Sequence, residues 1–203
     1  IIGSAELIEN GMVKPEDMPR FIGHIRTEAQ RLVALIADII RLSQLDEGVE
    51  MPKENVELLS LAGEVAEDLR AAADKASVTI TTDGQSSIVF GVRRLLYEML
   101  YNLCDNAIKY NRPGGSIRIH VENREQEAAI SVLDTGIGIA PEHQSRIFER
   151  FYRVDKSHSK ASGGTGLGLS IVKHAAMYHG GKVALESEPG RGTEIRVTLP
   201  KEH

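Results

Sequence analysis

The sequence predicts an α+β protein whose main part is a two-layer sandwich of helices and a β-sheet, preceded by a helical hairpin. Two observations support this prediction. Beyond residues 46–55, short β-like runs alternate with helical runs, and two pairs of β-like runs resemble antiparallel hairpins. Before that point, the chain has few glycines and a long helical pattern. We therefore divide the chain into residues 1–48 and residues 49–203.

The first part contains a helix with heptad spacing. Its apolar residues recur at alternating intervals of four and three residues between positions 18 and 39, and neighbouring apolar residues widen this stripe. A stripe this wide needs more than one partner, so we expect a bundle helix. An earlier helix within residues 4–12, ended by Gly11, and a turn at 14–17 with Asp17 as the N-cap complete a hairpin. Two such hairpins form a four-helix bundle, which predicts a homodimer.

The helices and strands of the second part are predicted from its hydrophobic periodicity and its turn residues. Turn signals stand at Pro113-Gly114-Gly115 and between Pro189 and Gly192. The pattern predicts helix 58–76, strands 78–82 and 88–90, helix 92–110, a hairpin of 116–122 and 128–134, helix 168–179, and a hairpin of 182–187 and 194–199.

Composition excludes several classes of protein. The 24 basic and 29 acidic residues give a net charge of -5, and no basic run is present, which argues against nucleic-acid binding. Apolar residues make up 41% of the chain, enough for a core. No apolar run approaches the roughly 18 residues that a membrane span needs. A single cysteine, Cys104, excludes an internal disulfide and a cysteine-cluster metal site.

A polar stripe marks the helix predicted at 92–110. Glu98, Asn102, Asn106 and then Lys109 or Tyr110 recur at helical spacing and share one face, while the opposite side is apolar. Taken alone, this pattern also fits the solvated face of an amphipathic helix.

A second motif follows the strand predicted at 128–134. Asp134 ends an apolar run and precedes Gly136 and Gly138. Such a turn lets the backbone approach a ligand closely while a carboxylate accepts a hydrogen bond from it. An ordinary strand-ending turn has the same pattern.

A third motif, residues 163–173, places four glycines before a helical pattern. Such a segment exposes backbone N–H groups at a helix N-terminus, where they bind phosphate. No Gly-Lys-Ser/Thr follows, and no βαβ unit surrounds the motif, so neither a Walker loop nor a dinucleotide fold fits.

In this order and at these separations, the three motifs resemble the N, G1 and G2 boxes of sensor histidine kinases. These kinases belong to the wider ATP-binding GHKL superfamily of gyrase, heat-shock chaperone, histidine kinase and MutL proteins. Residues 148–153 resemble the F box of that family, and residues 31–47 resemble the second helix of its dimerisation hairpin. The resemblance implies a GHKL (Bergerat) fold with a mixed sheet and three main helices.

The resemblance also implies roles for individual residues. Asp134 would accept a hydrogen bond from the adenine amino group of ATP, and Asn106 would be a ligand of Mg²⁺. Asn102 would lie near the phosphates, and Lys109 and Tyr110 would contact them. The remaining nucleotide-binding residues would be Gly136, Gly138, Gly164, Thr165, Gly166, Leu167 and Gly168. A mobile lid would span about 140–165 and carry Lys156, His158 and Lys160.

The residue at the position of Asn102 distinguishes the branches of the superfamily. Branches that hydrolyse ATP carry a glutamate general base four residues before the metal-binding asparagine, and an amide cannot take a proton from water. The resemblance therefore implies a protein-histidine kinase rather than an ATPase. An ATP-binding switch or serine kinase of the anti-sigma-factor type is the alternative, and the heptad hairpin argues against it. A non-catalytic scaffold that dimerises is a third possibility. The presence of Asn106, Asp134, Gly166 and Gly168 argues against it.

The phosphate acceptor is not evident in this chain. His24 and the residues after it loosely resemble the acceptor box, but the acidic residue next to the histidine and the later proline are missing. We expect the acceptor just upstream of Ile1, and we expect this stretch to bind nucleotide without phosphorylating itself. The implied partner is the receiver domain of a response regulator, which takes the phosphoryl group on an aspartate. The implied location is the cytoplasmic side of a bacterial protein anchored in the membrane through segments outside this chain.

Overall fold

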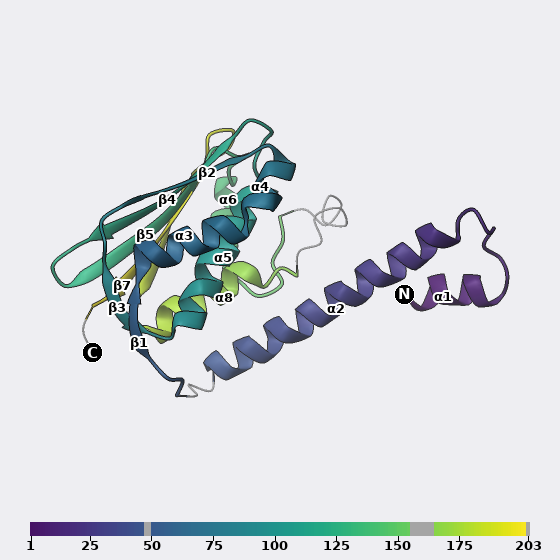
Figure 1. The fold of residues 1–203 in the computed structure, drawn as a ribbon, viewed down its shortest axis with the longest axis horizontal. Coiled ribbons are helices and arrows are strands. Elements are labelled where there is room, and N and C mark those ends of the chain that lie inside the picture. The colour runs from purple at the N-terminus through teal and green to yellow at the C-terminus, as the bar shows by residue number, and fades with distance from the viewer. Residues whose placement is uncertain (47–49, 155–164, 202–203) are drawn as a thin grey trace.

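The computed structural model describes residues 1–46, 50–154 and 165–201. Helix α1 (Ile2–Glu9) folds back beside α2 (Met18–Asp46), and α2 extends away from an α/β body as a long arm (Figure 1). Gly11 ends the first helix region with a positive φ of 65°, a conformation that glycine adopts without strain. The predicted helical hairpin is therefore confirmed.

The body contains a five-stranded sheet in the order β2-β4-β5-β7-β6. Strand β2 pairs with β4 in parallel and all the other pairs are antiparallel, so the sheet is mixed. This confirms the predicted α+β class. The strands are β2 (Thr79–Gly84), β4 (Ser116–Asn123), β5 (Glu127–Asp134), β6 (Lys182–Glu188) and β7 (Gly192–Pro200).

Helices cover one face of this sheet and form the second layer (Figure 1). Alternate residues of β4, namely Ile117, Ile119 and Val121, are fully buried, because successive side chains of a strand point to opposite faces. The residues between them face the other, open side. The helices are α3 (Leu58–Asp68), α4 (Arg70–Ala76), α5 (Arg93–Lys109), α6 (Pro141–Gln144) and α8 (Gly168–Tyr178).

The structure corrects two local predictions. The single helix predicted at 58–76 is two helices that meet at Leu69, whose side chain is buried in the core. No glycine or proline marks this break, so the local sequence offers no signal for it. A short strand, β1 (Glu54–Glu57), pairs with β3 (Ile88–Gly91), and the sequence analysis missed it. Four mostly polar residues are too few to show a strand period.

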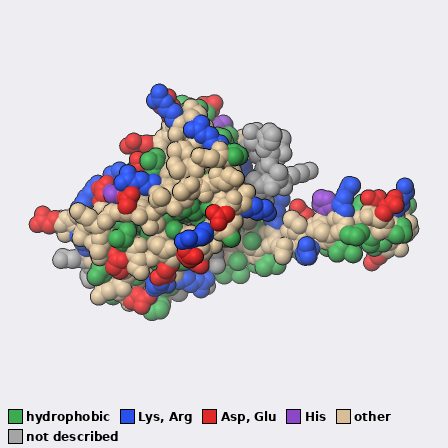
Figure 2. All heavy atoms as spheres, turned by 45° about the horizontal axis from the view of Figure 1, so that its top comes forward, with side chains coloured by type: hydrophobic (Ala, Val, Ile, Leu, Met, Phe, Trp, Pro, Cys, Tyr) green, Lys and Arg blue, Asp and Glu red, His purple; other side chains and the backbone are tan. Residues whose placement is uncertain are grey.

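The C-terminal half of α2 packs against the α/β body. Leu42, 3% exposed, packs against Leu167 and Ile171, with Leu35 partly buried beside them. Most of the apolar stripe of α2 nevertheless remains exposed, including Ile22 and Ile36 at 55% and 56%. Figure 2 shows hydrophobic side chains on the surface of this arm. Of the helices in the described residues, none is long and apolar enough to cross a bilayer.

Candidate functional site

The first and third motifs meet at Asn102. This residue lies on α5, and its side-chain amide donates a hydrogen bond to the backbone oxygen of Glu98 (2.8 Å). A Cβ atom added to Gly168, the first residue of α8, would lie 2.9 Å from Oδ1 of Asn102. The glycine therefore allows the start of α8 to pack directly against the polar face of α5.

The second motif joins the same site at the end of α5. The backbone N–H of Ile137 donates to the carbonyl of Tyr110 (3.0 Å). A Cβ atom on Gly136 would lie 2.4 Å from that carbonyl oxygen, so a side chain at this position would clash with backbone. All three predicted motifs thus converge around the C-terminal half of α5, while the side chain of Tyr110 remains exposed.

Asp134 is held in a fixed orientation at the end of β5. Its Oδ1 accepts a hydrogen bond from the N–H of Gly136 (2.7 Å), and its backbone pairs with Thr193 on β7. Burial raises the pKa of this carboxyl group, while hydrogen bonds from the Gly136 and Thr193 amides act in the opposite direction. Gly192 is required beside it, because a Cβ there would lie 1.9 Å from the Asp134 carbonyl oxygen.

The chain beyond Asp134 is anchored to the β6–β7 hairpin. Gly138 adopts a φ of 69° and passes so close to Glu188 that a Cβ would lie 2.1 Å from its carbonyl oxygen. The N–H of Ile139 donates to Oγ of Ser187 (2.8 Å), and the Gln144 amide donates to the carbonyl of Ser187 (2.9 Å). These contacts fix the start of the segment in which we expected a mobile lid.

Two residues in the first part of the expected lid are packed into the body. Within its first part, Ile147 is buried and Phe148 packs against the core. The positions 155–164, which include the predicted Lys156, His158, Lys160 and Gly164, lie outside the described residues.

The F box contacts the glycine-rich motif through backbone. The N–H of Phe151 donates to the carbonyl of Gly166 (2.9 Å), and both residues have positive φ, at 63° and 76°. This conformation is unfavourable for phenylalanine, so the surrounding contacts must maintain it. A Cβ on Gly166 would lie 3.1 Å from the Phe151 backbone, which leaves little room for any other residue.

Thr165 connects the glycine-rich motif to α2. Its hydroxyl accepts a hydrogen bond from the N–H of Leu167 (3.3 Å) and donates one to Oδ2 of Asp38 (2.9 Å). Leu167 is fully buried. The sequence analysis did not single out Asp38, because nothing local marks a polar residue on α2 as a neighbour of a turn 127 positions away.

Asn106 and Lys109 differ in what they contact. Within the described part of the chain, no hydrogen bond is made by the side chain of Asn106, which is half-buried on α5. Its amide oxygen fits the oxygen donors that Mg²⁺ takes. Nζ of Lys109, in contrast, lies 2.5 Å from Oδ2 of Asp105 on the same helix. Lys109 can bind a phosphate only by sharing or leaving this carboxylate.

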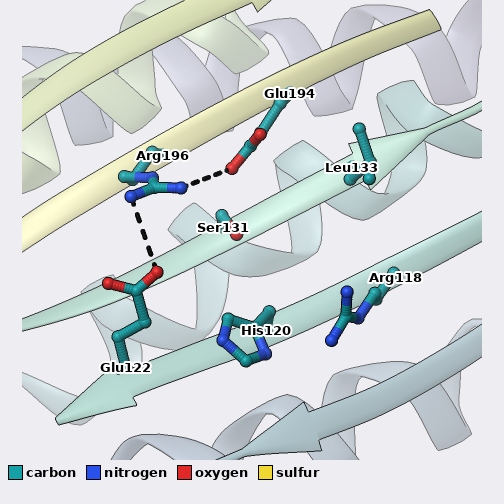
Figure 3. A pocket seen from close by; sticks show the side chains of 7 residues that line it. All are labelled: Arg118, His120, Glu122, Ser131, Leu133, Glu194 and Arg196. Atoms are coloured by element: carbon teal, nitrogen blue, oxygen red, sulfur yellow. Dashed lines mark hydrogen bonds and ion pairs between the residues drawn. The ribbon is translucent and has the colours of Figure 1, made fainter.

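A separate hollow of about 280 Å³ lies on the open face of the sheet, away from the three motifs. Figure 3 shows its lining from β4, β5 and β7, with Ser131 at its floor. Arg196 there pairs with Glu194 (3.0 Å) and Glu122 (3.5 Å). Of the predicted nucleotide-binding residues that the structure describes, none lines this hollow.

Comparison with known proteins identifies the family. Residues 91–203 match the sequence profile of the histidine kinase-, DNA gyrase B- and HSP90-like ATPases, and this chain belongs to that family. Within the family, the chain contains the catalytic region of a sensor histidine kinase with a preceding helical segment.

Individual relatives extend the similarity across almost the whole chain. The sensor-like histidine kinase SenX3 of Mycolicibacterium smegmatis is 40% identical over 189 residues, or 92% of this chain and 49% of SenX3. The structure of ShkA in complex with AMPPNP has a TM-score of 0.79, is 28% identical, and aligns over 98% of this chain and 42% of ShkA. The structure of histidine kinase ThkA with response regulator protein TrrA has a TM-score of 0.76 at 25% identity, over 98% of this chain and 56% of that one. The chain thus spans about half the length of SenX3.

Proposed function

We propose that the protein containing this chain is an ATP-dependent protein-histidine kinase of a two-component signalling system. One observation carries the proposal: the three motifs converge at α5. By the resemblance, Asn102, an amide, stands at the position where members of the superfamily that hydrolyse ATP carry a glutamate base. The similarity to SenX3 and to ThkA, whose structure contains a response regulator, supports this function.

The adenine would bind at Asp134. The carboxylate is partly buried and oriented by the Gly136 amide, and it would accept a hydrogen bond from the adenine amino group. Guanine presents an acceptor at that position, so the same carboxylate would select against GTP. The turns at Gly136 and Gly138, which no larger residue could form, would bring backbone against the base.

The phosphates would lie between α5 and the N-terminus of α8. Thr165, Gly166, Leu167 and Gly168 form the described part of this turn, and Gly164 would extend it. Lys109 and Tyr110 would contact phosphate oxygens from the end of α5. Asn106 would hold Mg²⁺, which would neutralise part of the triphosphate charge.

The reaction would be a transfer of the γ-phosphoryl group to an imidazole. A neutral nitrogen of the acceptor histidine forms a bond to the γ-phosphorus as the bond to the β–γ bridging oxygen breaks, and ADP leaves with the electron pair. Because Asn102 cannot take a proton, water is not activated, and ATP is kept for the protein acceptor. The phosphoryl group would then pass to an aspartate on a receiver domain.

The exposed stripe of α2 would pair with a second copy of the chain. Ile22, Leu32, Ile36 and Ile39 belong to the heptad stripe and are exposed, and a four-helix bundle would bury them. The domain division between residues 48 and 49 and the membrane anchor outside this chain stay predictions.

Calorimetric titration with ATP tests the nucleotide site. We expect one site per chain, and we expect Asp134→Asn to weaken binding by about tenfold or more, because a hydrogen bond to a charged group is lost. Asp74→Asn, the same substitution at an exposed carboxylate on α4, is the matched control and should leave binding unchanged. If the unchanged chain has no affinity for ATP or ADP, the proposed function is wrong.

A further inference from the structure

Asp38 is joined to the glycine-rich motif through a short chain of hydrogen bonds. The N–H of Leu167 donates to the Thr165 hydroxyl, and that hydroxyl donates to the Asp38 carboxylate (2.9 Å). A residue of the helical arm thus engages a hydroxyl that lies three residues before α8 in the sequence. The contact links two parts of the chain that are 127 positions apart.

The start of α8 is a place that favours negative charge. Its first N–H groups have no partners within the helix, its N-cap residue Leu167 makes no side-chain capping bond, and its first turn contains no acidic residue. The helix dipole adds a partial positive charge at this end. Asp38, acting through Thr165, therefore supplies the negative charge that the helix itself lacks.

An apolar contact holds Asp38 in place. One turn further along α2, Leu42 is buried against Leu167 and Ile171, and Leu35 covers the same cluster. Leu167 and Ile171 follow Thr165 in the chain, so this contact ties α2 to the segment that contains Thr165. The position of α2 and the position of the turn are consequently coupled.

We propose that Asp38 acts on the nucleotide site as a positioning residue, through Thr165. Its carboxylate competes with the nucleotide phosphates for the Thr165 hydroxyl and for the start of α8. The inference rests on the proposed function, since it requires phosphate to bind at this turn. A phosphate group and the Asp38 carboxylate are both anionic acceptors for the same hydroxyl. Binding of the one opposes contact with the other, so nucleotide phosphates release the arm and the docked arm weakens nucleotide binding.

The coupling depends on phosphate and not on the base. Adenosine would occupy the Asp134 end of the site and leave Asp38 on Thr165. ATP would place its phosphates near the turn and displace the carboxylate. The ratio of ATP affinity to adenosine affinity therefore isolates the contribution of Asp38, whereas a purely structural effect would change both affinities together.

Titration of the unchanged chain, Asp38→Asn and Glu28→Gln with ATP and with adenosine tests this inference. Asp38→Asn keeps a hydrogen-bond acceptor and removes the charge. We expect it to raise the ATP-to-adenosine affinity ratio about threefold to tenfold. Glu28→Gln removes one charge from an exposed position of the same helix, ten residues earlier, and should leave the ratio unchanged. Asp38→Ala, which also removes the acceptor, should raise the ratio at least as much.

Hydrogen exchange provides a second measurement. ATP should increase amide exchange in residues 35–42 of the unchanged chain, and adenosine should not. An unchanged or lower ratio in Asp38→Asn, with normal ATP binding by the unchanged chain, would overturn this inference and leave the proposed function intact. Loss of ATP binding by the unchanged chain would instead overturn both.

Discussion

Replacing His179 should destabilise the chain, because this buried histidine joins the end of α8 to the start of α5. The residue is 4% exposed. Its Nε2 accepts a hydrogen bond from the N–H of Val92 (2.9 Å), and its Nδ1 donates to the carbonyl of Ala175 (2.7 Å). The ring is therefore held as the neutral tautomer with the proton on Nδ1. Gly91 makes room for it, since a Cβ there would lie 2.7 Å from the ring.

The structure sets the size of the effect. His179→Phe keeps an aromatic ring in the site, somewhat larger than the imidazole, but leaves the Val92 N–H buried without an acceptor, which alone costs about 1–3 kcal/mol. His179→Ala also removes the ring and opens a cavity, and by analogy with other aromatic residues the total should reach about 3–5 kcal/mol. Val92 is the N-cap of α5, so the loss falls on the helix that carries the polar stripe.

Urea unfolding followed by far-UV circular dichroism measures these changes as shifts in the transition midpoint. His24→Phe, at an exposed position of α2, is the control and should stay within about 0.5 kcal/mol of the unchanged chain. If His179→Phe were as stable as His24→Phe, the hydrogen bond to Val92 would contribute nothing and the reasoning would be refuted.

Three further predictions concern stability, each measured by urea unfolding. Gly63→Ala, in the interior of α3 with nothing within 4 Å of the added Cβ, should stabilise the chain by about 0.5–1 kcal/mol, and a loss would contradict this. Burial raises the pKa of Asp134, so its ionised form opposes folding; Asp134→Asn should stabilise the chain at pH 7, and the gain should vanish at a pH below the ordinary pKa of aspartate. Arg118 and His120 lower the pKa of Asp83 to about 2, so Asp83→Asn should destabilise at pH 7, and the difference should shrink as the pH falls from about 4 towards 2. An effect of Asp83→Asn that did not depend on pH would show that these charges do not act through the carboxylate.

The sequence predicted most elements because their signals are local. In β4, buried residues alternate with more exposed ones, as the sequence pattern indicated. In α5, the polar and apolar residues lie on opposite faces, also as predicted. The break at Leu69 escaped prediction, because the residue is an ordinary helix former and only the packing of its side chain in the core distinguishes it. Strand β1 was missed because its pairing with β3, and not its own composition, makes it a strand.

The candidate site also contains some residues that local sequence indicates and others that only tertiary contacts reveal. Asp134, Gly136 and Gly138 were recognisable because a strand that ends in an aspartate followed by two glycines has a local chemical meaning. Tyr110 lies beside Gly136, and the packing of α8 on α5 places Asn102 beside Gly168. No local pattern indicates either contact. Asp38 had no local signal.

The sequence by itself determined the kinds of residue available for chemistry: a carboxylate at the end of a strand, an amide at position 102, and a row of glycines before a helix. It also determined the apolar stripe of α2, since a heptad spacing needs only the period of the helix. The tertiary structure alone decided that Asp38 engages Thr165 and that His179 accepts a hydrogen bond from Val92. The physical reason is that these are contacts between residues 87 and 127 positions apart, and the order of strands and the packing of helices set them, not any rule that acts between neighbours in the chain.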